Sequence, residues 1–197
     1  TSNIAVSTIS INRPPTLDLD LNDDHASGVN YATTYTDGAG GVSVADTDVQ
    51  VTDPDGALSG ATITLSNPKA GDVLTIGTLP FGISGSIVGN SVVLSGTATA
   101  ANYQTAIRAV TFSNSTATPD VTPRVLEITV TDGVATTAIA TTTISVVDVN
   151  SPPTIDLDGD NSSGALGNNY TANFSTTTHT PVAISDVDVV VADPDGV

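Results

Sequence analysis

Short stretches of alternating apolar and polar residues run along most of the chain, and Gly, Pro, Asn and Asp interrupt them roughly every eight to twelve residues. Thr, Val and Ile dominate these stretches, and all three favour extended backbone. The pattern therefore predicts an all-β protein. We expect strands at residues 3–11, 16–20, 31–36, 42–44, 48–52, 61–66, 73–76, 86–88, 91–95, 109–113, 125–131 and 136–147.

Residues 97–110 depart from this alternation and follow a helical period instead. The segment is rich in Ala and begins with Thr97, a candidate N-cap. Its larger apolar residues recur three or four positions apart, at Tyr103, Ala106, Ile107 and Val110. The spacing predicts a short helix, of about one or two turns, packed over one end of the β-structure.

Short, evenly spaced strands with turn residues between them are typical of two packed sheets. We therefore expect an immunoglobulin-like β-sandwich with Greek-key connections, rather than a closed barrel, with one short helix in each module.

The chain also repeats itself. The segment RPPTLDLD at residues 13–20 returns as SPPTIDLD at 151–158, an offset of 138 residues. The segment VADTDVQVTDPDG at 44–56 returns as ISDVDVVVADPDG at 184–196, an offset of 140 residues. Repetition on this scale indicates tandem modules. We expect the last strand of a preceding or partner module at 1–12, a complete module at 13–150 and the first part of a second module at 151–197.

Composition narrows the classes of partner. The 197 residues carry a net charge of −17 and only four Lys and Arg, so no basic patch is available for nucleic acid or an anionic membrane. No apolar run approaches the length that membrane insertion requires. Glu127 is the only Glu among 21 acidic residues. Such a strong preference for Asp fits turns, where a short carboxylate arm can share an ion with backbone carbonyls.

Most of the Asp residues gather in turn clusters that recur in both copies. Many are two residues apart, which places like charges close together and favours a bound cation. The candidate metal ligands are Asp18, Asp20, Asp46, Asp48, Asp53, Asp55, Asp132, Asp148, Asn150, Asp156, Asp158, Asp186, Asp188, Asp193 and Asp195. Because these are hard oxygen donors, they favour Ca²⁺. The alternative explanation is that these Asp residues only favour turn geometry. That explanation does not require the clusters to recur in both copies.

The two histidines, His25 and His179, occupy positions that do not match between the copies. We expect both on surface loops and apart from the acidic clusters, which disfavours zinc or copper. The sequence contains no nucleophile elbow and no phosphate-binding Gly loop, so an enzyme is not expected. A carbohydrate-binding sandwich would need exposed rings for stacking. The aromatic positions at Tyr31, Tyr35, Tyr170 and Phe174 instead predict core side chains.

Three segments resemble cadherin repeats. The junction VVDVNSPPTIDL at 146–157 is similar to the calcium-binding linker between cadherin domains, and VTDG at 130–133 to a cadherin turn. The segment YQTAIRAVTFSN at 103–114 is similar to the cadherin-like repeats of large, calcium-dependent bacterial adhesins of the RTX type, which type I systems secrete. This resemblance implies calcium ligands at Asp46, Asp48, Asp132, Asp148 and Asn150.

The resemblance also implies a function. We expect an extender module of a secreted, extracellular adhesin or fibre on a bacterial cell surface, in which calcium stiffens the junction between adjacent repeats. One alternative is a fibre subunit that assembles head to tail, with the strand at 1–11 of one chain donated to the incomplete second module of another copy. A carbohydrate-binding β-sandwich is a further alternative.

Overall fold

The computed structural model describes residue 9 and residues 11–196. The strand expected at residues 3–11, and the fragment of a preceding module expected at 1–12, therefore fall largely outside the described residues. The chain forms two compact units, the first ending at Asp148 and the second spanning Val149–Val197. This boundary lies two residues before the one that the sequence repeat predicts.

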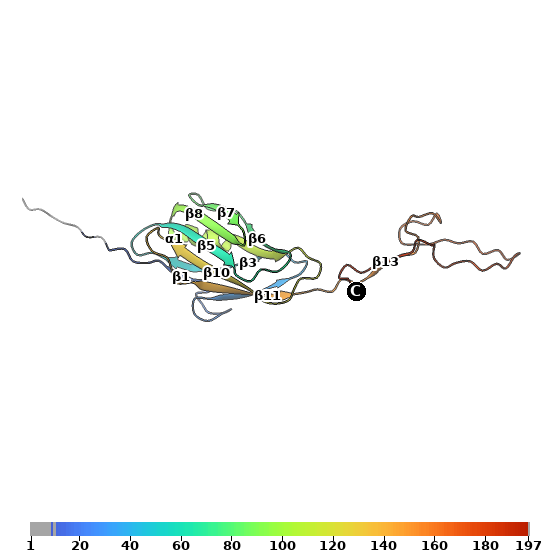
Figure 1. Cartoon of the computed structure of the whole chain (residues 1–197), viewed down its shortest axis with the longest axis horizontal. Coiled ribbons are helices and arrows are strands. Elements are labelled where there is room, and N and C mark those ends of the chain that lie inside the picture. The colour runs from blue at the N-terminus through green and yellow to red at the C-terminus, as the bar shows by residue number, and fades with distance from the viewer. Residues whose placement is uncertain (1–8, 10, 197) are drawn as a thin grey trace, which may run out of the picture. The chain divides into compact units, whose positions relative to one another are not determined.

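The first unit is built almost entirely of strands, as the alternating pattern predicts (Figure 1). Its strands are β1 (Thr16–Asp18), β2 (Tyr31–Thr36), β3 (Val42–Ser43), β4 (Gln50–Thr52), β5 (Leu58–Leu65), β6 (Asp72–Ile76), β7 (Ser84–Val88), β8 (Ser91–Ala98), β9 (Val110–Asn114), β10 (Arg124–Thr131) and β11 (Ala140–Val147). Most of the expected strands are present. Strands β5, β7 and β8 are longer than expected, whereas β1, β4 and β11 are shorter.

The strands of the first unit form three sheets. The largest has the order β2-β11-β10-β5-β8-β7, the second β3-β9-β6, and β1 pairs with β4. Neighbours run antiparallel except β2 and β11, which run parallel from Tyr31 opposite Thr142 to Thr36 opposite Val147. Side chains from all three sheets contribute to one hydrophobic core. This arrangement is consistent with an all-β sandwich.

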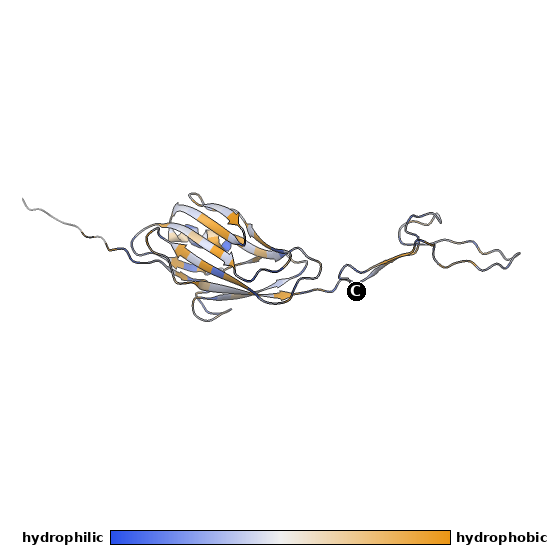
Figure 2. Cartoon of the chain, viewed as in Figure 1, coloured by the Kyte–Doolittle hydropathy of each residue, from blue (hydrophilic) through white to orange (hydrophobic). Residues whose placement is uncertain are grey.

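Hydrophobic residues alternate with hydrophilic ones along several of the long strands, as the colour bands in Figure 2 show. In β5, for example, Ile63 is fully buried, whereas its neighbours Thr62 and Thr64 are only partly buried. In β9, Val110 and Phe112 are both fully buried. The two-residue side-chain period of a strand is the reason that such alternation fills a core from one face.

Helix α1 (Ala100–Arg108) follows β8 and has nine residues, about two and a half turns. Tyr103, Ala106 and Ile107 are fully buried, which confirms the predicted apolar face. The predicted cap at Thr97 is wrong, because β8 continues to Ala98 and the Thr99 side chain accepts a hydrogen bond from the Asn102 N–H. Among the described residues, no helix is both long and apolar enough to span a membrane.

A buried ion pair joins two of the sheets. Arg124 opens β10 and Asp72 opens β6, and neither side chain is more than 1% exposed. Arg124 Nε lies 2.8 Å from Asp72 Oδ2, and Arg124 Nη2 lies 3.1 Å from Asp72 Oδ1. Asn114 Nδ2 and the Lys69 N–H also donate to the carboxylate of Asp72. A charged pair with its hydrogen-bonding capacity filled in this way ties the two sheets together at one end.

The second unit contains two strands among its described residues, β12 (Thr154–Asp156) and β13 (Val190–Ala192), which pair antiparallel. The expectation that Tyr170 and Phe174 are core residues is wrong, since Tyr170 is half-buried and Phe174 is 55% exposed. The corresponding Tyr31 and Tyr35 are buried in β2, which lies beside β11. No counterpart of β11 is present among the described residues of the second unit, so this segment lacks a partner strand.

Candidate metal sites in the two copies

The first cluster of candidate ligands comprises Asp20, Asp24, His25 and Asp46. One ligand atom from each lies within 4.8 Å of those of the other three. Asp20 follows β1 and Asp46 precedes β4, so the pairing of these strands brings the two loops together. The Asp46 N–H donates to the Leu19 carbonyl at 3.0 Å and holds the second loop against the first.

Asp20 is the most buried member of the first cluster, with no exposed surface. Its Oδ2 accepts hydrogen bonds from the N–H groups of His25 at 2.9 Å and Ala26 at 2.7 Å. Burial alone would raise the pKa of Asp20, but the backbone N–H groups of Ala26, His25 and Asp24 bring it below its ordinary value. Its Oδ1 is also buried and has no hydrogen-bond partner. A buried, ionised oxygen without a partner is costly, and a cation would satisfy it.

Asp48 does not belong to the first cluster, and its side chain instead accepts hydrogen bonds from nearby backbone N–H groups. Its two oxygens accept hydrogen bonds from Leu21 N–H at 3.2 Å and Asn22 N–H at 3.0 Å. The expectation that Asp48 lies in a strand is wrong, because residues 47 and 48 form a turn and β4 begins only at Gln50. Asp18 plays a similar part, with its Oδ1 accepting from Asp20 N–H at 3.2 Å.

The second cluster comprises Asp158, Asp160, Asp186 and Asp188, again with one ligand atom from each within 4.8 Å of the others. Asp158 is fully buried. Asp188 Oδ2 accepts a hydrogen bond from Asp160 N–H at 2.8 Å, whereas its buried Oδ1 has no partner. Each cluster therefore contains one buried carboxylate oxygen that no protein group satisfies.

The two copies use the same backbone frame around their clusters. Asp186 N–H donates to Leu157 O at 2.8 Å, as Asp46 N–H does to Leu19 O. Asp156 Oδ1 accepts from Asp158 N–H at 3.1 Å, the counterpart of the Asp18 contact. Strands β12 and β13 pair in the register of β1 and β4. The repeated sequence thus specifies this local structure even though the second unit has no counterpart of the large sheet among its described residues.

The copies differ in the residues that close the loop. In the first, Asp24 and His25 follow Asp23, whose φ is 56°. In the second, Ser162 and Ser163 follow Asn161, whose φ is 57°.

Both serine hydroxyls of the second copy point at carboxylates. Ser162 Oγ donates to Asp186 Oδ2 at 2.7 Å, and Ser163 Oγ donates to Asp158 Oδ2. Serine and backbone groups hold the pKa of Asp158 below its ordinary value: the Ser163 hydroxyl has the largest effect, and burial opposes it. The second site is therefore made of oxygen atoms alone.

Other predicted ligands lie in turns outside the two clusters. Asp53 Oδ1 accepts from Asp55 N–H at 3.0 Å, and Asp193 Oδ1 from Asp195 N–H at 3.1 Å. Asp55 and Asp195 in turn accept hydrogen bonds from the backbone N–H groups of residues 13 and 151. These four carboxylates shape the Asp-Pro-Asp-Gly turns and fasten them to the start of each copy.

Three further predicted ligands also stand apart from the clusters. Asp132 Oδ1 accepts hydrogen bonds from Ala135 and Val134 N–H, each at 2.7 Å, and Asn12 Nδ2 donates to Asp132 Oδ2 at 2.9 Å. These donors, with Ala135 first, lower the pKa of Asp132. Asp148 and Asn150 are exposed, and Asp148 belongs to no group of three or more clustered carboxylate or histidine side chains among the described residues.

Three members of the clusters are absent from the set of predicted ligands, namely Asp24, His25 and Asp160. His25 is half-exposed on a loop, as expected. The expectation that no histidine accompanies an acidic cluster is wrong, because β1 and β4 bring Asp46 beside His25. The position of Asp24 and His25, four and five residues after Asp20, was the available sequence signal.

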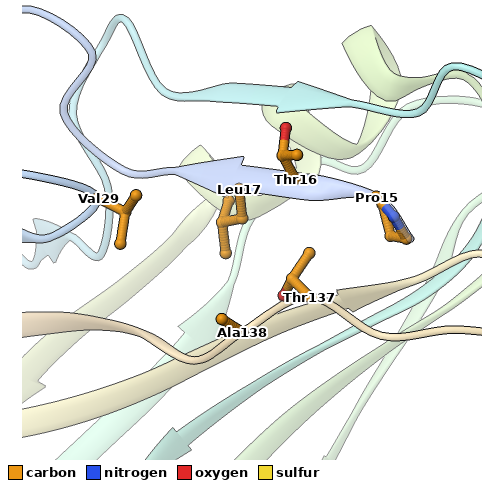
Figure 3. A pocket seen from close by; sticks show the side chains of 6 residues that line it. All are labelled: Pro15, Thr16, Leu17, Val29, Thr137 and Ala138. Atoms are coloured by element: carbon orange, nitrogen blue, oxygen red, sulfur yellow. The ribbon is translucent and has the colours of Figure 1, made fainter. Parts of the chain in front are cut away.

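An apolar pocket of about 200 Å³ lies beside β1, as Figure 3 shows. Leu17 and Val29 form one side, and Thr137 and Ala138 lie opposite (Figure 3). No carboxylate, histidine or aromatic ring lines this pocket. It therefore offers neither acid–base groups nor a stacking platform for a sugar.

Comparisons with protein-family models, curated proteins and solved structures give no match to this chain.

Proposed function

We propose that this chain is a calcium-stabilised structural module of an extracellular bacterial adhesin or fibre, with cadherin-like Greek-key repeats in tandem. One observation carries the proposal. The same acidic frame occurs in both copies, and each holds a buried carboxylate oxygen that no protein group satisfies. Turn geometry alone does not require an unsatisfied, buried carboxylate oxygen in each copy.

The donor chemistry supports calcium. The second cluster offers four carboxylates and the Ser162 hydroxyl, and Ca²⁺ takes six to eight oxygen ligands with flexible geometry. Carbonyl groups of the surrounding loops and water would complete such a shell. The ion would neutralise charge that otherwise opposes compaction of a chain with a net charge of −17.

A structural role follows from linkage. A ligand that binds only the folded state stabilises it, and millimolar calcium at a site with a Kd of about 10⁻⁴ M contributes about 1.4 kcal/mol. The folded module would then be favoured outside the cell, where calcium is abundant. Such a module suits a spacer that is exported unfolded and folds after export.

Calcium is expected to raise the melting temperature of the first unit by about 3–8 °C relative to chelator, as linkage at the first cluster would give. Differential scanning calorimetry with a calcium titration measures the shift, and magnesium at equal ionic strength controls for charge screening. Equal shifts with magnesium or sodium would leave the acidic residues as turn formers and exclude the proposed role.

Two variants of the same loop test whether the calcium-dependent melting shift arises at the first cluster. Asp20→Asn removes the buried charge and is expected to abolish the calcium-dependent shift of the first cluster. Asp23→Asn removes the same charge from an exposed residue outside the cluster, and the second copy already has Asn161 at the corresponding position. Asp23→Asn is expected to retain the shift. Loss of the shift in both variants would indicate general electrostatics instead of a site.

A further inference from the structure

The first cluster contains an imidazole among its carboxylates, and the structure holds that ring in place. His25 Nδ1 lies against Asp24 Oδ1 and 3.7 Å from Asp46 Oδ2. On another side, the ring meets Tyr31 edge to face, with centroids 5.4 Å apart and planes at 66°. Tyr31 is itself buried in β2. The packing therefore keeps the imidazole beside the acidic cluster.

The corresponding place in the second copy contains a different atom. There Ser163 stands at the position of His25, and its hydroxyl donates to Asp158 Oδ2. Ser162, at the position of Asp24, donates to Asp186 Oδ2. The second cluster is thus made of oxygen atoms, whereas the first combines three carboxylates with one ring nitrogen. The strands beside both clusters pair in the same register, and Asp20 and Asp46 match Asp158 and Asp186. The other two members differ, since Asp24 and His25 belong to the first cluster and Asp160 and Asp188 to the second.

We propose that the first cluster is a site for a transition-metal dication of the zinc class, bound by Asp20, His25 and Asp46 with Asp24, and that the second cluster is not. Zinc forms four-coordinate sites from histidine nitrogen and carboxylate oxygen, and four such groups converge here. Calcium prefers oxygen alone. The two copies would then differ in ion preference, and calcium would occupy the first cluster only in the absence of zinc.

A second feature of the first cluster points to a ligand independently of its acidity. Asp20 is fully buried, and its Oδ1 has no hydrogen-bond partner although its Oδ2 has two. The two backbone donors at Oδ2 fix the carboxylate and leave the other oxygen for a cation. The cluster therefore has an anchored carboxylate and an anchored imidazole on one short loop.

The proposal rests on the first cluster alone and stands whether or not calcium stabilises the module. Zinc binding to the whole chain, freed of metal with chelator, is measured by titration calorimetry, and Co²⁺ absorption reports nitrogen ligation. We expect one site per chain that His25→Gln weakens by about tenfold or more. The same change at His179, the other histidine, provides the matched control. His179 lies on an exposed loop and belongs to neither cluster, so His179→Gln is expected to leave zinc affinity unchanged.

A second pair of variants tests whether zinc binds at the first cluster and not at the second. Asp20→Asn is expected to remove the zinc site, whereas Asp158→Asn, the corresponding change in the second copy, is expected to leave it intact. Melting in chelator shows whether each variant is folded. The proposal is overturned if zinc does not bind, if His25→Gln binds as tightly as the parent chain, or if His179→Gln loses affinity equally.

Calcium measurements on the same variants separate the two proposals. His25→Gln is expected to lose zinc affinity and to keep the calcium-dependent rise in melting temperature. A chain that binds zinc through His25 but shows no specific calcium shift would refute the calcium function and support this inference. A chain that shows the calcium shift but binds no zinc would support the calcium function and refute this inference.

Discussion

Replacing Arg124 with methionine is expected to lower the free energy of unfolding by about 3–5 kcal/mol, because the change leaves Asp72 buried, charged and unpaired. Arg124 is fully buried and pairs with both oxygens of Asp72. It also donates through Nη1 to the Asp120 carbonyl at 2.7 Å. Equilibrium unfolding in urea measures the loss.

Two controls make the Arg124 result specific. Arg13→Met removes the same side chain from an exposed position and is expected to change stability by less than about 0.5 kcal/mol. Combining Arg124→Met with Asp72→Leu removes both charges and is expected to restore much of the loss, since an apolar pair often replaces a buried ion pair at little cost. A single variant as stable as the parent chain would show that the pair does not hold the sheets together.

The Phe112→Ala variant is expected to lose about 3–5 kcal/mol, because truncating a buried ring leaves a cavity that the core fills only in part. Phe112 lies at the centre of the three-stranded sheet, opposite Val42 on β3 and Leu74 on β6. Its ring meets that of Tyr35, on the six-stranded sheet, edge to face with centroids 5.6 Å apart. The residue thus connects two sheets through one aromatic pair, and calorimetric or urea unfolding would measure the change.

Phe112→Leu is the matched control for this prediction. It keeps most of the volume and is expected to cost less than about 1.5 kcal/mol beyond the loss of the aromatic pair, itself about 0.5–1.5 kcal/mol. Equal losses for Ala and Leu would show that the ring contact, and not the filled volume, dominates. A loss below about 1 kcal/mol for Ala would contradict the placement of Phe112 in the core.

Local patterns in the sequence predict the elements of this fold well. The strand expected at 31–36 has those bounds in the structure, and Tyr103, Ala106 and Ile107 are the buried face of α1 as their spacing predicts. Both follow from periods of two and 3.6 residues, which are properties of one segment at a time. The recurrence of the acidic clusters can also be recognised from the sequence, because the two copies repeat the same residues.

Long-range pairing explains what the sequence did not predict. Asp72 lies outside every acidic cluster, and its partner Arg124 lies 52 residues away, so no local pattern indicates the buried pair. Asp46 reaches His25 only because β4 pairs with β1. The backbone of residues 46–48 turns instead of extending, because Asp48 is drawn to the N–H groups of Leu21 and Asn22. Each of these contacts depends on a distant segment.

The parallel pairing of β2 with β11 has a mechanical consequence for the first unit. The chain enters β2 at Tyr31 and leaves β11 at Val147, which lie at opposite ends of the pair. Once β1 has separated from β4, tension along the chain pulls β2 and β11 past each other, and all six residue pairs carry the load together. Single-molecule stretching should show one high-force rupture for this unit, whereas gradual opening at low force would mean that the tension bypasses these strands. A spacer in a surface fibre would gain from this geometry, because its resistance to flow would come from backbone pairing that needs no bound ion.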